Sequence, residues 1–540
     1  MLQVVHSDLY SLKADRQYSS SSSGIFSRGS IFFKDKDGSL VSAASLQSGF
    51  VVTINPKILK NLEEVYEKIN AITPIDREKF FAKALKPSSS YEEVASRVES
   101  SLGEKINSLN ITGLKAYKER WRFYPGGSTA AHIVGMMGYQ GDDFAGRYGL
   151  ERQFESILKR STDSYGNFFA QIFSNIKAAA AKDLEGEADI VTTIEPTIQT
   201  SLEKTLVSIN NKLSSEATGG IILDPKTGEI YAMEMYPTFD PNHPELLKNI
   251  SVLSNPLVEN VYEMGSIIKS LTVAAGIDAG VITATSTYYD SGFLIVNNKK
   301  ISNFDGKERG IVSMQDVLSQ SLNVGAAHVA KLLGNKRLTD YFYAFGLNEK
   351  TGIDLPNEGR NLMDNLKSPR DIEHFTASFG QGIAMTPISA TRALATIANG
   401  GVMVSPHVVK NINYKIGVSD QTEITSGKRV IKRETAEELT RMMVHSVDKV
   451  LAGGIYKLQN YSIAVKTGTA QMAKEGGGGY YEDKFLHSFV GYFPAYNPKF
   501  FVFLYTIDPK GFRFSSETLT GPFMELAKYL INYYELPPDR

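Results

Sequence analysis

The 540-residue sequence contains no cysteine, which excludes disulfides, thiolate nucleophiles and cysteine-ligated metals. Its formal net charge is only -1 and it has no long basic tract, which argues against nucleic acid as a partner. Long apolar runs are also missing, because the richest run, 500–505, is far shorter than a membrane-spanning helix. The first residues lack the basic and apolar regions of a signal peptide, so we expect any export signal or anchor to lie outside this sequence.

What is present is an ordinary globular composition, with 42% hydrophobic and 22% charged residues. A chain of this length is longer than a single hydrophobic core usually supports, so we predict two or three domains. Its first part reads as a serine-rich loop (19–23), short strands, a helical pattern from about 56 to 120, as in 59–72 and 91–109, and a glycine-rich connector (122–158). We place a boundary near 175–190, which gives an N-terminal domain (1–180) and a C-terminal domain (181–540).

The C-terminal domain begins with a predicted strand (189–194), a helix from about residue 197 and a hairpin. A helix-rich stretch, 266–399, separates this hairpin from three late strands and a closing helix. This order predicts an α+β fold in which an antiparallel sheet, flanked by helices, is built from both ends of the domain. The expected hairpin strands are 219–223 and 229–235, the late strands are 461–465, 485–493 and 499–507, and the closing helix is 518–534.

Ser266 is the candidate nucleophile, because Ser-x-x-Lys on a helix places a base on the same face as the hydroxyl. Lys269 has this spacing, and Ser266 opens the apolar run 267–274. Burial of the lysine would lower its pKa and make it a usable base. The spacing alone is weak support, because it recurs in more charged surroundings at Ser156/Lys159, Ser174/Lys177, Ser201/Lys204 and Ser446/Lys449.

Two further short motifs follow along the chain. Ser321 and Asn323 form Ser-x-Asn between helical segments, and Lys466-Thr467-Gly468 ends a strand-like run and continues into Thr469. A strand edge can pair with a peptide main chain, with Gly468 permitting close approach and Lys466 holding a carboxylate. Each motif has copies, to which we assign surface or turn roles: Ser108/Asn110, Ser208/Asn210, and Lys-Thr-Gly at Lys226 and Lys350.

The order of the three motifs is hard to obtain by chance and is the pattern of penicillin-binding proteins and β-lactamases. The sequence resembles a class B penicillin-binding protein, a peptidoglycan D,D-transpeptidase closer to the septal, cell-division type. The segments that carry this resemblance are 28–31 and 122–158 in the non-catalytic pedestal, 219–242, 262–269, 313–325 and 377–401 around the first two motifs, and 466–471, 479–481 and 488–495 near the third. Met264 departs from the proline that is usual before the nucleophile.

The resemblance implies a role for each matching residue. Ser266 would attack the D-Ala-D-Ala bond of a stem peptide while Lys269 takes its proton, and Ser321 and Asn323 would relay a proton to the leaving amine. The terminal carboxylate would be bound by Lys466, Thr467 and Thr469 on the strand that also contains Gly468. The backbone N–H groups of Ser266 and Thr469 would form the oxyanion hole. No metal or organic cofactor is implied.

The resemblance also implies partners and a location. These are peptidoglycan stem peptides, β-lactam antibiotics, a polytopic glycosyltransferase and division-complex proteins, at the extracytoplasmic face of the plasma membrane, with an anchoring helix outside this chain.

Two alternatives stay open. One is a hydrolase, either a D,D-carboxypeptidase or a β-lactamase, and the other is a catalytically idle division scaffold. Rapid turnover of a β-lactam would favour the lactamase, and failure to acylate Ser266 would favour the scaffold.

Overall fold

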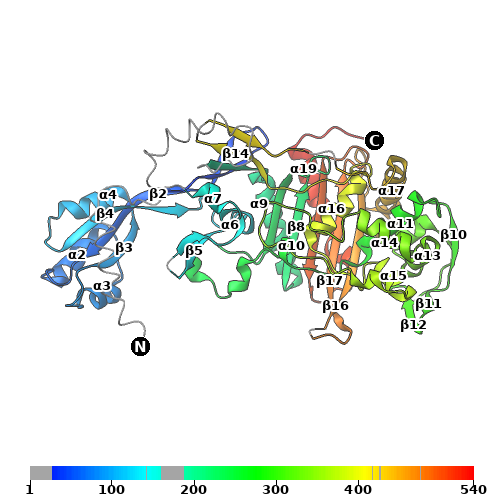
Figure 1. The fold of residues 1–540 in the computed structure, drawn as a ribbon, viewed down its shortest axis with the longest axis horizontal. Helices are drawn as coiled ribbons and strands as arrows, with labels where there is room; N and C mark the ends of the chain where they lie inside the picture. Colours follow the sequence, from blue (N-terminus) through cyan, green and yellow to red (C-terminus); the bar gives the residue numbers. More distant parts are fainter. Residues whose placement is uncertain (1–26, 142, 160–187, 416, 425–426, 475) are drawn as a thin grey trace.

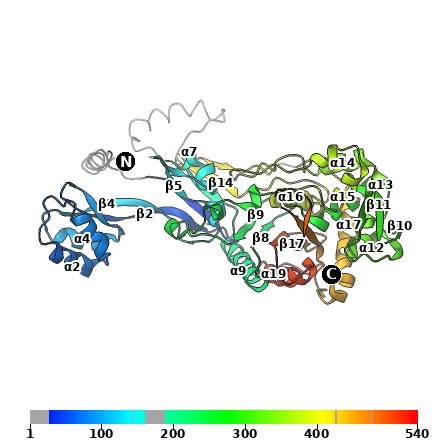
Figure 2. The same cartoon turned by 90° about the horizontal axis from the view of Figure 1, so that it is seen from below.

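The computed structural model describes residues 27–141, 143–159, 188–415, 417–424, 427–474 and 476–540. It is elongated, with a small α/β head at one end and a large domain of sheet and helices at the other (Figures 1 and 2). The serine-rich run 19–23 and the pair Ser174/Lys177 lie outside the described residues. Among the described helices, none is both long enough and apolar enough to cross a membrane.

The N-terminal part alternates short helices with strands. Its elements are β1 (Ile31–Lys34), β2 (Leu40–Ile54), α2 (Leu62–Ile72), α3 (Arg77–Ala84), β3 (Glu92–Val98), α4 (Ser100–Ser108), β4 (Leu114–Phe123), α5 (Ala131–Val134), β5 (Met137–Gln140), β6 (Asp143–Gly146), α6 (Gly149–Gln153) and α7 (Glu155–Leu158).

The C-terminal part contains a long helical stretch between two sets of strands. Its regular elements are β7 (Ala188–Thr192), α9 (Pro196–Leu213), β8 (Ala217–Leu223), β9 (Ile230–Tyr236), α10 (Pro256–Glu259), α11 (Lys269–Asp278), β10 (Thr287–Asp290), β11 (Phe293–Val296), β12 (Lys299–Ser302), β13 (Gly310–Ser313), α12 (Met314–Ser319), α13 (Asn323–Leu333), α14 (Asn335–Ala344), α15 (Asp371–Ala377), α16 (Pro387–Ala398), β14 (Val409–Tyr414), β15 (Ser419–Gln421), α17 (Arg433–His445), β16 (Ala464–Ala473), β17 (Tyr480–Phe493), β18 (Phe500–Ile507), α18 (Ser515–Thr518) and α19 (Thr520–Tyr533). Short 3₁₀ turns include η3 (Gly265–Ile268).

The long strand β2 connects the head to the rest of the molecule (Figure 1). Its first half pairs with β1, and its second half pairs with β3 and β4 in the head. β1 in turn pairs in parallel with β7, which pairs with β14. The sheet therefore combines strands from both sides of residue 180, because β7 and β14 follow that position in the sequence.

The sequence predicted a helix over 91–109, and the first half of that prediction was wrong. Glu92–Val98 forms strand β3, and only Ser100–Ser108 is helical. β3 pairs antiparallel with the second half of β2, with Val98 buried opposite Phe50. Pairing and packing against another strand override the helical spacing of charged and apolar residues in this short segment.

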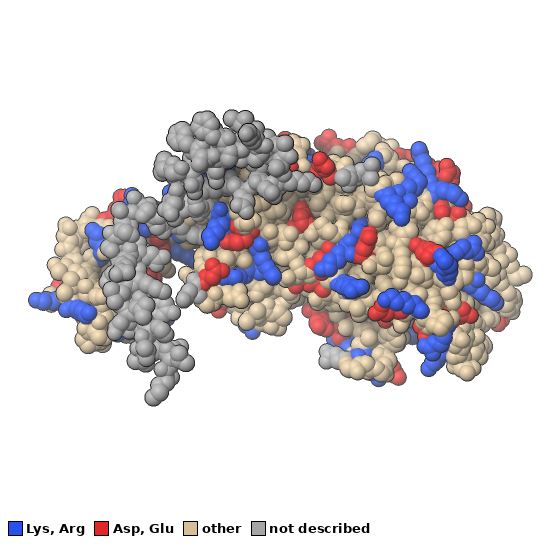
Figure 3. Space-filling view, viewed as in Figure 1, with Lys and Arg blue, Asp and Glu red and all other residues tan. Residues whose placement is uncertain are grey.

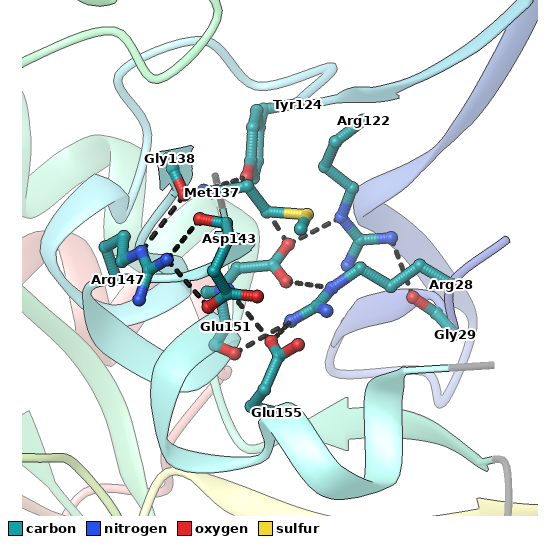
Figure 4. A network of polar contacts seen from close by, with 11 residues as sticks. Arg28, Gly29, Arg122, Tyr124, Met137, Gly138, Asp143, Arg147, Glu151 and Glu155 are labelled. Atoms are coloured by element: carbon teal, nitrogen blue, oxygen red, sulfur yellow. Dashed lines mark hydrogen bonds and ion pairs between the residues drawn. The ribbon is translucent and has the colours of Figure 1, made fainter. Parts of the chain in front are cut away.

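A buried ion cluster joins the start of β1 to β4 and α6 (Figure 4). The fully buried carboxylate of Glu151 accepts hydrogen bonds from Arg28 Nε at 2.6 Å and Arg122 Nε at 2.5 Å. Arg28 also pairs with Glu155 at 2.7 Å, and Arg122 donates to the carbonyl of Gly29 at 2.7 Å. Glu151 is thus the carboxylate that both guanidinium groups share, and Glu155 is a second partner of Arg28.

The C-terminal domain is built on an antiparallel sheet with strand order β16-β17-β18-β8-β9. Strands from the start of the domain (β8, β9) and from its end (β16, β17, β18) lie side by side, which confirms the predicted fold class. The apolar run 500–505 is the fully buried central strand β18. Helices α9 and α19 cover one face of the sheet, whereas α16 and α17 pack on the other (Figure 1).

Two late strands differ from their predicted bounds, because β17 begins at Tyr480 rather than at 485 and β16 differs at both ends. We predicted a strand at 461–465 that ends at the Lys-Thr-Gly motif, but β16 begins at Ala464 and continues to Ala473. Lys466 pairs with Val490 and Thr469 with His487 in β17, so the motif lies inside the strand. Pairing with a long neighbouring strand extends β16 beyond the apolar residues that marked it in the sequence.

The buried ion cluster yields a stability prediction. Replacing Glu151 with alanine leaves buried Arg122 without a carboxylate partner among the described residues and leaves Arg28 with Glu155 alone, and we expect a loss of about 3–5 kcal/mol in the free energy of unfolding. Thermal and urea melts followed by circular dichroism would measure it. Glu64→Ala removes a fully exposed partner of Lys68 and serves as the control, for which we expect no measurable change. Equal melting curves for both variants would contradict the prediction.

Candidate active site

Ser266 lies in the turn η3, which continues directly into α11. It is half-buried and lines a cleft of about 740 Å³. Gly265 adopts a positive φ of 61°, and a Cβ there would lie 2.7 Å from the carbonyl oxygen of Thr469. Only glycine permits this close approach between the turn and strand β16. The predicted start of an apolar helix at Ser266 is confirmed, with a 3₁₀ first turn.

Lys269 is fully buried at the start of α11. Its Nζ donates to the carbonyl oxygen of Ser321 at 2.5 Å and to Ser321 Oγ at 3.1 Å. Burial, together with the nearby charge of Lys466, lowers the pKa of Lys269 well below its ordinary value. A neutral amine able to accept a proton is therefore accessible near neutral pH.

Ser321 lies between α12 and α13, as the sequence predicted. Its backbone is in the left-handed region, with φ of 58°, a conformation that non-glycine residues adopt mainly where surrounding structure enforces it. Its Oγ also accepts a hydrogen bond from Lys466 Nζ at 3.0 Å. The first, second and third motifs therefore meet at one hydroxyl group, although they lie far apart in the sequence.

Asn323 lines the same cleft as Ser321, and Lys466 contacts the Ser321 hydroxyl. Asn323 Nδ2 donates to the carbonyl oxygen of Ser302 at 2.9 Å, which orients its side chain on the cleft wall. Lys466 is 3% exposed, and its Nζ donates to the carbonyl oxygen of Thr467 at 2.8 Å. Burial lowers the pKa of Lys466 to about 7. Its charge is thus sensitive to pH in the physiological range.

Strand β16 presents alternate residues of the third motif to different surroundings. Thr467 and Thr469 line the cleft, and Thr469 Oγ1 accepts a hydrogen bond from the backbone N–H of Ser515 at 3.1 Å. Gly468 faces the nucleophile turn instead. A Cβ on Gly468 would lie 2.3 Å from Ser488 Oγ and 2.8 Å from the carbonyl oxygen of Met264. Gly468 therefore has a packing role in the structure. The close approach of a peptide main chain to Gly468 stays a prediction.

Met264, the departure from the usual proline, is fully buried before the nucleophile turn. Its φ is −85°, a value close to that of proline, so methionine takes this backbone conformation without strain. Its carbonyl oxygen accepts a hydrogen bond from Ser488 Oγ at 3.0 Å, which ties the turn to β17.

The copies of the motifs have ordinary structural surroundings. Lys159, Lys204 and Lys449 are exposed, whereas Lys269 is buried. The Lys-Thr-Gly copies at Lys226 and Lys350 lie in turns or loops, as expected. Burial of the lysine separates the candidate catalytic pair from its described copies.

Sequence reasoning missed several residues of the cleft wall. The rings of Phe304 and Phe514 meet edge to face, with centroids 5.3 Å apart, and come from segments on opposite sides of the cleft. Arg309 lies over the first ring and Arg513 over the second. No spacing or motif in the sequence links these four residues, since they lie in two loops that only the fold brings together.

Comparison with known proteins agrees with this geometry. Residues 218–525 match the family model of the penicillin-binding protein transpeptidase domain, and residues 26–183 match that of the penicillin-binding protein dimerisation domain. The first match alone spans more than half of the 540 residues. The chain belongs to the penicillin-binding protein family. Both matches together confirm the predicted class B type, in which a pedestal precedes the transpeptidase domain.

Curated members of the family are similar along most of the chain. Stage V sporulation protein D of Bacillus subtilis is 28% identical over 510 residues, which cover 91% of this chain and 76% of that protein. Peptidoglycan D,D-transpeptidase FtsI of Buchnera aphidicola (subsp. Schizaphis graminum) is 25% identical over 553 residues, covering 100% and 92% of the two chains.

Solved structures show the same fold. Penicillin-binding protein 3 from Mycobacterium tuberculosis, complexed with aztreonam, is 22% identical, with a TM-score of 0.71 over 96% of this chain and 98% of the other. Penicillin-binding protein 2X from Streptococcus thermophilus is 20% identical, with a TM-score of 0.75 over 95% and 81% of the two chains.

The buried lysines predict how acylation of this protein depends on pH. The expected roles are that Lys269 takes the proton of Ser266 and that Lys466 binds a carboxylate. Acylation by a β-lactam would then require neutral Lys269, so its rate constant should rise with pH through the lowered pKa of Lys269 and then level off. Binding of the ligand's carboxylate requires charged Lys466, so initial affinity should fall above about pH 7. Stopped-flow acylation across this range separates both quantities. Values that do not change with pH would contradict the prediction.

Proposed function

We propose that this protein cross-links peptidoglycan stem peptides as a serine D,D-transpeptidase, through an acyl-enzyme formed on Ser266. The observation that carries the proposal is the meeting of Lys269 and Lys466 at Ser321 Oγ, beside the half-buried Ser266 in the cleft. A nucleophile with an adjacent neutral amine and a cation for the substrate carboxylate is what acyl transfer from a D-Ala-D-Ala terminus requires. The name of one curated relative, peptidoglycan D,D-transpeptidase FtsI, supports this assignment.

The reaction begins with a tetrahedral intermediate on Ser266, which collapses to the acyl-enzyme when D-alanine leaves. Ser266 Oγ attacks the carbonyl carbon of the penultimate D-alanine while Lys269 accepts the hydroxyl proton. Negative charge develops on the carbonyl oxygen, and the backbone N–H groups of Ser266 and Thr469 stabilise it. Gly265 and Gly468 hold these two segments close together, because side chains at either position would push them apart.

The second half releases D-alanine and transfers the acyl group. Lys269 and Lys466 both hydrogen-bond to Ser321 Oγ, so this hydroxyl can relay a proton toward the leaving amine while Asn323 positions the substrate amide. Lys466, Thr467 and Thr469 hold the terminal carboxylate until D-alanine departs. The amine of a neighbouring stem peptide then attacks the acyl-enzyme, which gives the cross-link and restores the Ser266 hydroxyl.

The place of the protein in the cell follows from its substrate. We propose a role in septal wall synthesis at the extracytoplasmic face of the plasma membrane, where stem peptides are cross-linked. We further propose that residues 1–180 form a pedestal that contacts a polytopic glycosyltransferase and division proteins, and that 181–540 form the transpeptidase domain. The boundaries of the two family matches support this division of the chain.

The nucleophile assignment has a direct test. Ser266→Ala should abolish covalent labelling by penicillin while leaving the fold intact, because a small residue replaces a small one in a turn beside a cleft. Mass spectrometry of the intact protein and of the peptide containing residue 266 measures the adduct. Ser201→Ala, in a Ser-x-x-Lys copy on α9, is the matched control and should label normally. Labelling of Ser266→Ala equal to wild type would reject the assignment.

The base assignment predicts a different defect. Lys269→Ala should slow acylation by about a hundredfold or more, the usual range for loss of a general base, while initial binding persists. Stopped-flow measurement of the rate constant and of the dissociation constant distinguishes the two effects. Lys204→Ala, whose lysine is exposed, is the control. An unchanged rate constant in Lys269→Ala would assign the base to another residue.

The remaining alternatives separate by the fate of the acyl group. A stable penicilloyl adduct on Ser266, together with a dimeric product from stem peptides and an acceptor amine, supports the transpeptidase. Rapid turnover of the β-lactam identifies a β-lactamase, and release of D-alanine without a cross-linked product identifies a carboxypeptidase. Absence of any adduct on the wild-type protein leaves the scaffold.

A further inference from the structure

The carboxylate of Glu263, three residues before Ser266, has no part in the reaction described above. It is partly buried and accepts a hydrogen bond from the hydroxyl of Tyr480, which lies 3.0 Å from each carboxylate oxygen. It also accepts a hydrogen bond from the backbone N–H of Gly382 at 3.1 Å. One side chain thus contacts two segments that are more than a hundred residues away in sequence.

Each of the two contacted segments belongs to a wall of the cleft. Tyr480 is the first residue of β17 and pairs with Ala473 at the end of β16, the strand that contains Thr467 and Thr469. Four consecutive glycines precede Tyr480, and in Figure 1 the hairpin of β16 and β17 projects beyond the body of the domain. Gly382 follows Gln381, which lines the cleft.

The environment of Glu263 makes these hydrogen bonds important to it. No charged side chain among the described residues shifts the pKa of Glu263. Burial raises this pKa, and the hydrogen bonds from Tyr480 and Gly382 act against that rise. A partly buried carboxylate with neutral donors alone depends on those donors for its stability. Loss of the Tyr480 hydroxyl would therefore weaken the attachment of the hairpin to the nucleophile turn.

We propose that Glu263 is a positioning residue, and that its hydrogen bond with Tyr480 fixes the β16–β17 hairpin against the nucleophile turn in the geometry needed for acylation. The backbone N–H of Thr469 and that of Ser266 must point to one oxygen atom, and they belong to the two segments that this bond connects. The inference rests on the proposed function, since it concerns the rate at which Ser266 is acylated.

Tyr480→Phe is the variant that tests the inference, because it removes one oxygen atom and keeps the ring. We expect the rate constant for acylation by a fluorescent penicillin to fall at least about fivefold, in line with a hydrogen bond to a charged group. The melting temperature should match that of Tyr481→Phe, the control at the next residue, whose acylation should equal that of wild type. Equal rate constants in the two variants would overturn the proposal.

A double-mutant cycle shows whether Tyr480 acts through Glu263. Glu263→Ala should slow acylation at least as much as Tyr480→Phe, and combining the two should slow it no further than Glu263→Ala alone. Glu263→Gln retains an oxygen acceptor and should recover part of the rate. Two results would assign Tyr480 a separate structural role and overturn the inference. One is a double variant whose fold loss in acylation rate equals the product of the two single losses, and the other is no recovery of the rate in Glu263→Gln.

The proposed function and this inference fail in different ways. If wild-type protein forms no adduct with penicillin, the transpeptidase assignment fails. If wild type is acylated and the Tyr480 and Glu263 variants are acylated at the same rate as wild type, only the positioning role of Glu263 fails.

Discussion

The site depends on two lysine side chains that share one hydroxyl group in a buried space. Lys269 and Lys466 both donate to Ser321 Oγ, and both are removed from water. Two ammonium groups at this separation in an apolar setting repel each other and lack solvation, so the doubly charged state is costly. Burial therefore favours the neutral amine at Lys269, three residues after Ser266, and lowers the pKa of Lys466 to about 7, so that Lys466 can still carry a charge for a substrate carboxylate.

The rest of the domain serves to bring these lysines together. Lys269 is carried by α11, Ser321 by the junction of α12 and α13, and Lys466 by β16. The helices pack against a sheet whose strands come from both ends of the domain, so the third motif reaches the first only after the whole domain has folded. The close contacts at Gly265 and Gly468 set the distance between the helix and the strand.

The N-terminal part holds the head at a distance from the large domain (Figure 1), whose visible face carries Lys and Arg interspersed with Asp and Glu (Figure 3). A long strand, β2, spans this distance by pairing with different partners along its length. Glu151, Arg28 and Arg122 connect the residues just before β1 to β4 and α6 by a buried ion cluster. Polar contacts of this kind specify geometry because each group must find its partner.

Much of this could be read from the sequence. The order of the three motifs and the apolar run after Ser266 indicated the reaction, and the hairpin and the late strands indicated the α+β sheet, because these signals are local and periodic. The helix predicted at 91–109 failed in its first half, because the pairing of β3 with a distant strand outweighed local spacing. The extent of β16 was underestimated for the same reason.

What the sequence determined by itself was the set of reacting groups and the elements that carry them. Only the tertiary structure decided that Lys269 and Lys466 meet at Ser321 Oγ, that Phe304 contacts Phe514, and that Glu263 lies between Tyr480 and Gly382. Burial and contacts between distant segments depend on how elements pack, and the pKa values that govern the chemistry follow from that packing.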